Sequence, residues 1–292
     1  MSATNAFPQI SARRRRTDKV MRASLFAATM IALIPLILII YYLIHKGLSA
    51  WTQSGFFTTD PTGSFFGSPG GIRSAILGSL EIVALATLIS IPTGIGVALY
   101  LTEYGKQSWF ANTVRYFVDV MTGVPSIMMG LFIYIVLVIG RVGGSGFAAW
   151  KGSVALWLLM LPIVIRSSEV VLLLVPSSLR EAALALGAPR WRVVFRVVLP
   201  TAASGLVTGS LLAIARGMGE TAPLLFTVST AFTLTFSLNH QMNTMPFLIY
   251  TDITSPRAEI QTIAWGTALT LVVIVLILNL LARFIASRSR MA

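Results

Sequence analysis

The segment Pro176–Pro200, PSSLREAALALGAPRWRVVFRVVLP, separates two long apolar runs and decides how the chain is organised. Within it, Ser178 followed by Glu181 matches a capping box, in which each side chain satisfies an exposed backbone N–H group at a helix start. The predicted helix has one narrow apolar face with helical spacing, made by Leu179, Ala182, Ala183 and Leu186. Gly187 suits the left-handed residue at the end of this helix, and Pro189 suits the first turn of a second one.

The second predicted helix of this segment is also amphipathic. One face carries arginines, Arg192 and Arg196, and the opposite face carries Trp191, Val194, Phe195 and Val198. Pro200 marks the start of the next apolar run. Two interpretations stay open from the residues alone. Either the helices lie flat on lipid with their arginines at the headgroups, or the first helix, whose alanines allow close approach, fits a pocket on another protein.

The composition is that of a membrane protein. Of the 292 residues, 55% are hydrophobic and only 11% are charged, against roughly 25% charged residues in soluble domains. Most of the net charge of +12 comes from short loops beside apolar runs, as an orientation signal requires, so nucleic-acid binding is not expected. The chain has no cysteine, and its two histidines, His45 and His240, lie in different loops, so no metal site is expected.

The apolar runs predict six membrane-spanning helices and therefore an all-α membrane protein. The predicted spans cover residues 23–44, 74–101, 119–140, 152–175, 201–230 and 263–282. The second and fifth exceed the ~20 residues that a span needs, and Pro92 and Pro223 interrupt them.

The positive charges orient these spans. Fifteen of the 22 Lys and Arg residues lie in the two terminal segments and in the loops after the second and fourth spans, whereas five lie on the opposite side. Basic loops stay in the cytoplasm, so both termini are predicted to be cytoplasmic. The predicted domains are a basic cytoplasmic tail (1–22), a first span with its periplasmic segment (23–71), a five-span core (72–282) that contains the loop 178–200, and a cytoplasmic tail (283–292).

Charges inside the spans indicate function or buried pairing, because each costs about 2.5–3.5 kcal/mol in a membrane. Arg166 and Glu169 stand three residues apart and are predicted to form a structural ion pair. Arg216 is predicted roughly 22 Å into the fifth span, beside Glu220. Its guanidinium suits the oxygens of a phosphate-type anion, with Glu220 holding it when no anion is present. A permanent structural pair is the alternative for these two residues.

The loop resembles the EAA loop of permeases from ABC importers. The resemblance rests on Glu181, Ala182, Ala183, Gly187, Leu199 and Pro200, and on Val197, which stands where the pattern prefers Ile. It implies a type I importer permease fold in which this loop is a cytoplasmic coupling helix seated in a separate ATPase. Gly105–Ser108 does not complete a phosphate-binding loop, so ATP and Mg are expected on that partner, and no cofactor and no catalysis are expected in this chain.

Further motifs resemble the PstA-type phosphate permease family. They are PTGIGVALYLTEY (92–104), GVPSI (123–127) and ARGMGETAPLL (215–225). The resemblance implies that Arg216, Glu220 and Thr221 lie on the phosphate path. It also implies a PstC-type permease, a PstB-type ATPase dimer and a periplasmic phosphate-binding protein as partners, in the lipid of the bacterial inner membrane. Alternating access is the mechanism it implies.

Two other functions remain open from the residues. A pore arginine also suits other oxyanions, so an ABC importer permease for sulfate or molybdate is the first alternative. An ATP-independent secondary transporter is the alternative from another class, but it would leave the coupling loop without a partner.

Overall fold

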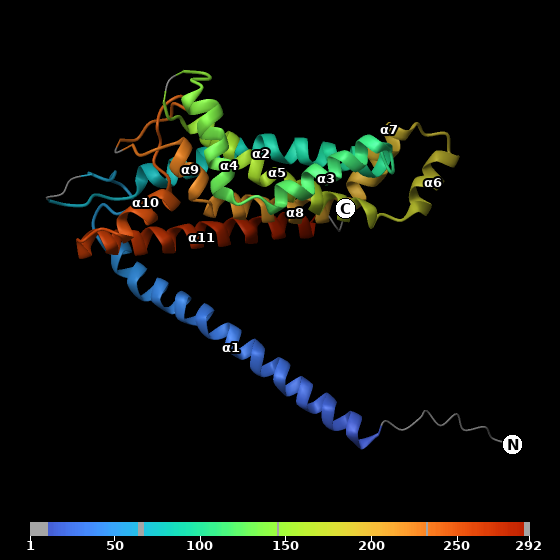
Figure 1. Ribbon diagram of the computed structural model, residues 1–292, viewed down its shortest axis with the longest axis horizontal. Coiled ribbons are helices and arrows are strands. Elements are labelled where there is room, and N and C mark those ends of the chain that lie inside the picture. The colour runs from blue at the N-terminus through green and yellow to red at the C-terminus, as the bar shows by residue number, and fades with distance from the viewer. Residues whose placement is uncertain (1–10, 64–66, 145, 232, 289–292) are drawn as a thin grey trace.

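The computed structural model describes residues 11–63, 67–144, 146–231 and 233–288, and this part of the chain is helical (Figure 1). No β-strand occurs in it, and one isolated bridge joins Pro61 to Gly70. The elements are α1 (Ala12–Trp51), α2 (Arg73–Leu99), η1 (Tyr100–Tyr104), α3 (Trp109–Gly123), α4 (Ser126–Ile133), η2 (Tyr134–Ile139), α5 (Ala149–Leu173), α6 (Ser177–Ala185), α7 (Arg190–Val193), η3 (Val194–Val198), α8 (Leu199–Gly219), α9 (Ala222–Thr227), α10 (Met245–Ile253) and α11 (Ala258–Arg288). The three η elements are π-helices, which have a wider turn than the α-helix. The all-α class is confirmed.

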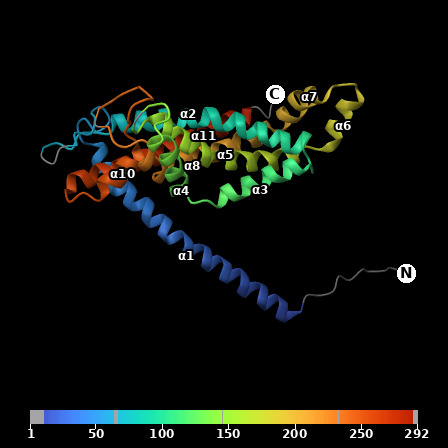
Figure 2. The ribbon, with the colours of Figure 1, turned by 45° about the horizontal axis from the view of Figure 1, so that its top comes forward.

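Four long helices, α2, α5, α8 and α11, form a bundle whose core lies between them. Small and polar residues let α2 and α5 approach closely, and Ser153 Oγ of α5 donates to the carbonyl of Ile82 in α2 at 3.0 Å. The start of α1, the end of α11 and α6 lie toward one end of the bundle, and α10 lies toward the other (Figures 1 and 2). In the part of the chain that the structure describes, five helices are long and apolar enough to cross a membrane, and a bent pair raises the number to six.

Helix α1 leaves the bundle along most of its length (Figure 1). In the described structure α1 packs on the bundle at its C-terminal end, where Trp51 Nε1 donates to Thr270 Oγ1 of α11 at 3.0 Å. The helix begins at Ala12, where Ser11 Oγ accepts from Arg14 N at 3.4 Å as the N-cap. The predicted basic tail, residues 1–22, is therefore helical from Ala12 onward, so the first helix is longer than the predicted span of 23–44.

The third predicted span, residues 119–140, is wrong as a single helix. Helices α3 and α4–η2 meet at an angle of 105°. The break lies at Val124, which is extended (φ −75°, ψ 127°), and Pro125, which serves as the N-cap of α4. A proline disfavours the helical conformation of the residue before it, so the chain leaves the helix at Val124 and restarts after Pro125.

The fifth predicted span, residues 201–230, is also wrong at both ends. Helix α8 stops at Gly219 and Glu220 is extended, because Pro223 has no N–H group with which to continue the helix; α9 then begins at Ala222. At the other end, α7, η3 and α8 form one continuous helix from Arg190 to Gly219. Pro200 therefore lies inside a helix and does not mark its start, because the wide turn of η3 accommodates a residue that donates no hydrogen bond.

The capping box predicted at Ser178 and Glu181 does not form. Helix α6 starts at Ser177 with Pro176 as its N-cap, and no side chain caps it, because the extended backbone of Pro176 already begins the helix upstream of Ser178. The predicted end is confirmed, since Gly187 has φ +78°. Ala188 N donates to the Ala183 carbonyl at 3.2 Å across this turn, which is the hydrogen bond of a Schellman motif.

Candidate functional site

The arginine and glutamate at the C-terminal end of α8 form the pair that the sequence predicts. Arg216 Nε donates to Glu220 Oε1 at 3.2 Å, across one turn. The side chain of Arg216 is 57% exposed, whereas that of Glu220 is 14% exposed. Within the described residues Arg216 has no other ion pair, and more than half of its side chain is uncovered.

The pair lies near the middle of the bundle's length. Gly217, next to Arg216, packs on Met160 so closely that a Cβ on this glycine would lie 2.9 Å from the Met160 sulfur. Met160 stands close to the centre of the 25-residue helix α5. At 1.5 Å per residue, either end of α5 is about 16–20 Å away, which agrees with the predicted depth of Arg216.

The backbone is irregular beside this pair. After α8 ends, Glu220 is extended and Thr221, whose side chain is half-buried, leads into the short helix α9. Helix α4, in the second half of the bent span, packs on α9, with Gly130 against Pro223. Discontinuous helices at mid-membrane depth are tolerated where they face protein or a water-filled path, and they form the binding sites of many transporters.

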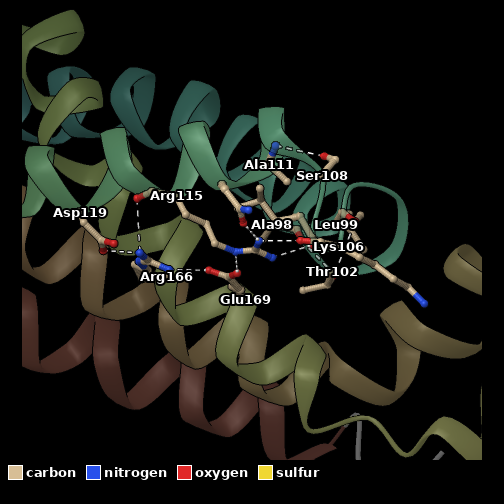
Figure 3. A network of polar contacts seen from close by, with 12 residues as sticks. Ala98, Leu99, Thr102, Lys106, Ser108, Ala111, Arg115, Asp119, Arg166 and Glu169 are labelled. Atoms are coloured by element: carbon tan, nitrogen blue, oxygen red, sulfur yellow. Dashed lines mark hydrogen bonds and ion pairs between the residues drawn. The ribbon is translucent and has the colours of Figure 1, made fainter.

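The second charged group predicted inside the spans, Arg166 with Glu169, belongs to a larger network (Figure 3). Arg166 Nη1 donates to Glu169 Oε2 at 2.8 Å, so the predicted structural pair is confirmed. Arg166 also pairs with Asp119 of α3, and Glu169 also accepts from Arg115 Nε of α3 at 2.7 Å. The buried carboxylate of Glu169 therefore lies between two guanidinium groups, and the network fastens α3 to α5.

Arg115 extends this network to the end of α2 (Figure 3). Its Nη2 donates to the carbonyl of Leu101 in η1 at 2.9 Å, and its Nη1 donates to the carbonyl of Lys106 at 2.6 Å. These carbonyls need such donors because the helix ends here. The sequence analysis did not identify Arg115 or Asp119, because each pairs with a residue about 50 positions away in the chain.

The loop after α5 projects from one end of the bundle (Figure 2). No residue of α6 is buried, and its contacts with the bundle are few. Among the predicted loop residues, Glu181, Ala182 and Gly187 are exposed, and Ala183 is half-buried on the side of α6 that contacts α7 and η3. The other two predicted loop residues, Leu199 and Pro200, lie in the first turn of α8. The structure therefore does not place them beside the exposed residues of α6.

This loop makes one ion pair with the bundle that was not predicted from the sequence. Arg180 of α6 pairs with Glu103 of η1, with Nη2 at 2.9 Å from Oε1, above a cavity of about 200 Å³ that both residues line. Both lie in segments predicted to be cytoplasmic, and Glu103 is the acid of the motif at 92–104. The sequence therefore placed both residues on the same side of the membrane. It could not show that they pair, because they are 77 positions apart in the chain.

A cavity of about 420 Å³ lies at the opposite end, between α10 and the segment around Pro61. Asp252 of α10 lines it, and burial raises the pKa of its carboxyl to about 6. Asp60 nearby accepts hydrogen bonds from Arg73, which hold the pKa of Asp60 below its usual value. In the described part of the chain, no group of three or more His, Asp or Glu side chains is placed to hold a metal ion.

Comparison with known proteins finds a family and close relatives. Residues 90–291 match the family model "Binding-protein-dependent transport system inner membrane component". The chain is 41% identical over 278 residues to the phosphate transport system permease protein PstA of Yersinia pestis, covering 95% of this chain and 92% of the relative. It is 38% identical over 270 residues to PstA of Haemophilus influenzae, covering 92% of this chain and 94% of that one.

Solved structures show the same fold at lower identity. A chain of a bacterial alginate ABC transporter in complex with its pentasaccharide-bound periplasmic protein matches with a TM-score of 0.65 at 14% identity, covering 94% of this chain and 96% of that chain. A chain of the inward-facing MetNI methionine ABC transporter matches with a TM-score of 0.56 at 20% identity, covering 75% and 94%. At these identities the likeness concerns the fold alone.

Proposed function

The chain belongs to the binding-protein-dependent transport system inner membrane component family, and we propose that it is the permease subunit of an ATP-driven phosphate importer. The relatives at 38–41% identity are phosphate permeases over nearly their whole length. The observation within the site that supports this cargo is Arg216, a half-exposed arginine in the middle of the bundle with one carboxylate partner.

Arg216 binds the anion through the part of its guanidinium that Glu220 leaves uncovered. The Glu220 carboxylate takes only the Nε donor in this structure, at 3.2 Å. Two phosphate oxygens accept parallel hydrogen bonds from the guanidinium fork, in a site where the low dielectric strengthens them. Glu220 holds the arginine when the path is empty and repels the anion from its own side, which favours brief rather than permanent binding. Thr221 directly follows Glu220, at the break between α8 and α9, and lies on the same anion path.

The permease performs no covalent chemistry. A second permease of the PstC type completes the path opposite the exposed face of Arg216. A PstB-type ATPase dimer binds ATP and Mg, and α6 docks on it through its exposed residues Glu181 and Ala182. A periplasmic phosphate-binding protein delivers the anion at the end of the bundle that carries α10. The chain is then a multi-pass protein of the bacterial inner membrane, with α6 and both termini on the cytoplasmic side.

The test replaces Arg216 by Gln in the reconstituted complex and measures phosphate uptake into proteoliposomes. Hydrogen bonds to charged groups are worth about 1.5–3 kcal/mol, so we expect uptake to fall at least tenfold while the complex stays assembled. Arg22→Gln is the matched control, because Arg22 also pairs with a carboxylate one turn away, Asp18, but at the start of α1. Undiminished uptake by Arg216→Gln would place the anion site elsewhere.

A second measurement separates phosphate from the other oxyanions. ATP hydrolysis by the complex is compared with binding protein loaded with phosphate and with sulfate, since a guanidinium alone binds both anions. Stimulation by phosphate only is expected. Uptake that survives ATP depletion, with no ATPase subunit in the purified complex, would instead indicate a secondary transporter.

A further inference from the structure

Arg180 is the residue through which α6 is fastened to the bundle. Its Nε and Nη2 donate to Glu103 Oε1 at 3.1 and 2.9 Å. Its Nη1 donates to the carbonyl of Val175 at 2.6 Å, and Nη2 also donates to the carbonyl of Leu172 at 2.9 Å. One side chain thus joins α6 to the end of α5 and to η1 at the end of α2.

This fastening stands out because α6 has little else. The Arg180 and Glu103 side chains are only 21% and 12% exposed, although no residue of α6 counts as buried. In the described residues, no other side chain of α6 makes a hydrogen bond or ion pair with another element. The helix is also bounded by two breaks in the helical backbone, the extended Pro176 at its start and Gly187, with φ +78°, at its end.

Glu103 lies in the element that also bonds to α3. It belongs to η1, and the carbonyl of Leu101 in the same π-helix accepts a hydrogen bond from Arg115 of α3 at 2.9 Å. Arg115 in turn pairs with Glu169 of α5 (Figure 3). η1 therefore lies between Arg180 of the docking loop and Arg115 of the bent span. π-helical turns recur at functional positions because their wide turn shifts more easily than an α-helix.

We propose that Glu103 and Arg180 are positioning residues that make α6, η1 and α3 move as one unit. A displacement of α6 by the ATPase then reaches α2 and α3. Without the pair, the same displacement would be taken up at the two breaks in the helical backbone on either side of α6. This inference rests on the proposed function in one respect, that an ATPase docks on α6.

The functional test measures phosphate uptake per ATP hydrolysed in proteoliposomes. Glu103→Gln keeps the size of the side chain but removes its charge, and we expect at least a fivefold loss of uptake per ATP with the ATPase still bound. Arg180→Gln is expected to act likewise, and the double variant to be no worse than the stronger single one. Asp18→Asn is the matched control, because it neutralises an exposed carboxylate that also pairs with an arginine. Parent-like coupling in Glu103→Gln, or losses that multiply in the double variant, would overturn the proposal.

A second experiment does not depend on the cargo. Because the chain has no cysteine, Ser178→Cys and Trp109→Cys place spin labels on α6 and α3 alone; Ser178 is exposed and Trp109 is 81% exposed. We expect one narrow distance distribution in the parent, with and without ATP-bound ATPase, and a broad one in Glu103→Gln. An equally narrow distribution in Glu103→Gln would refute the proposal that this pair makes α6, η1 and α3 move together. If the distances behave as expected but the parent moves no phosphate, the proposed cargo fails and the unit stands.

Discussion

Two glycines of α2 should respond in opposite ways to the same substitution. A Cβ on Gly78 would lie 2.2 Å from the carbonyl oxygen of Asn243, in the segment that leads into α10. That segment cannot retreat easily, because Asn243 is buried and Met245 N donates to Ser79 Oγ of α2 at 2.8 Å. A Cβ on Gly96, by contrast, would meet nothing within 4 Å.

The magnitude follows from these contacts. Overpacking costs about 1–3 kcal/mol, and we expect Gly78→Ala near the upper value because the clash is with backbone. Alanine is preferred over glycine inside a helix by roughly 0.5–1 kcal/mol, which offsets part of the cost at Gly78 and is the whole effect at Gly96. The two variants should therefore differ by about 3 kcal/mol. At about 2–4 °C per kcal/mol for domains of comparable size, this corresponds to roughly 6–12 °C in Tm.

The assay is thermal unfolding of the full chain in detergent, followed by tryptophan fluorescence. Gly78→Ala should unfold below the parent and Gly96→Ala at or slightly above it. Circular dichroism before heating should show equal helix content in all three proteins. A Gly78→Ala variant as stable as Gly96→Ala would mean that α2 does not approach Asn243 as closely as the structure shows.

Three further outcomes are expected. Lys151, 1% exposed, donates through Nζ to the carbonyls of Gly144 at 3.1 Å and Gly146 at 2.8 Å. Lys151→Met removes both hydrogen bonds and should speed protease cleavage of the segment before α5; unchanged cleavage would show that they do not hold this segment. The pKa of Asp252 is raised from 3.8 to about 6, so the folded protein binds more protons than the unfolded chain between these values, and its stability should fall as the pH rises from about 4 to 6 and stay low above. Asp252→Asn should flatten this part of the plot of Tm against pH; an unchanged slope would show that Asp252 does not cause it. Gly187→Ala puts a Cβ at φ +78°, at a cost of roughly 1–2 kcal/mol, and should reduce the ATPase retained on purification; full retention would show that the turn tolerates alanine.

Several features could be predicted because they depend on neighbouring residues. The apolar runs gave the long helices, since a bilayer demands about 20 apolar residues whatever the rest of the chain does. The ion pair of Arg166 with Glu169 and that of Arg216 with Glu220 follow from helical spacing alone. The left-handed Gly187 follows from a glycine at the end of a helix.

The bend at Pro125 could not be predicted, because the same residue type has different effects elsewhere. Pro35, Pro92 and Pro162 all lie inside intact helices. The bend depends on tertiary packing, since α4 leaves the direction of α3 to cross α9 at Gly130.

The capping box failed for a related reason. Its pattern concerns Ser178 and Glu181 only, whereas the helix start was decided by the backbone of Pro176. The pair of Glu103 with Arg180 required knowledge that the ends of α2 and α5 meet. Long-range contacts of this kind lie outside any pattern of spacing along the chain.

The isolation of α1 has a consequence for biosynthesis. Among the described residues its main packing partner is α11, where Trp51 binds Thr270 and Gly47 packs against Leu269, so α1 is made long before the helix on which it packs. At 5–20 residues per second, a ribosome needs roughly 10–45 s to pass from Trp51 to Thr270. During that interval α1 must wait in the bilayer without a protein neighbour. The uncharged stretch of α1, residues 23–44, can do so without exposing a charge to lipid, and the arginines at the start of the helix can fix its direction before the bundle exists.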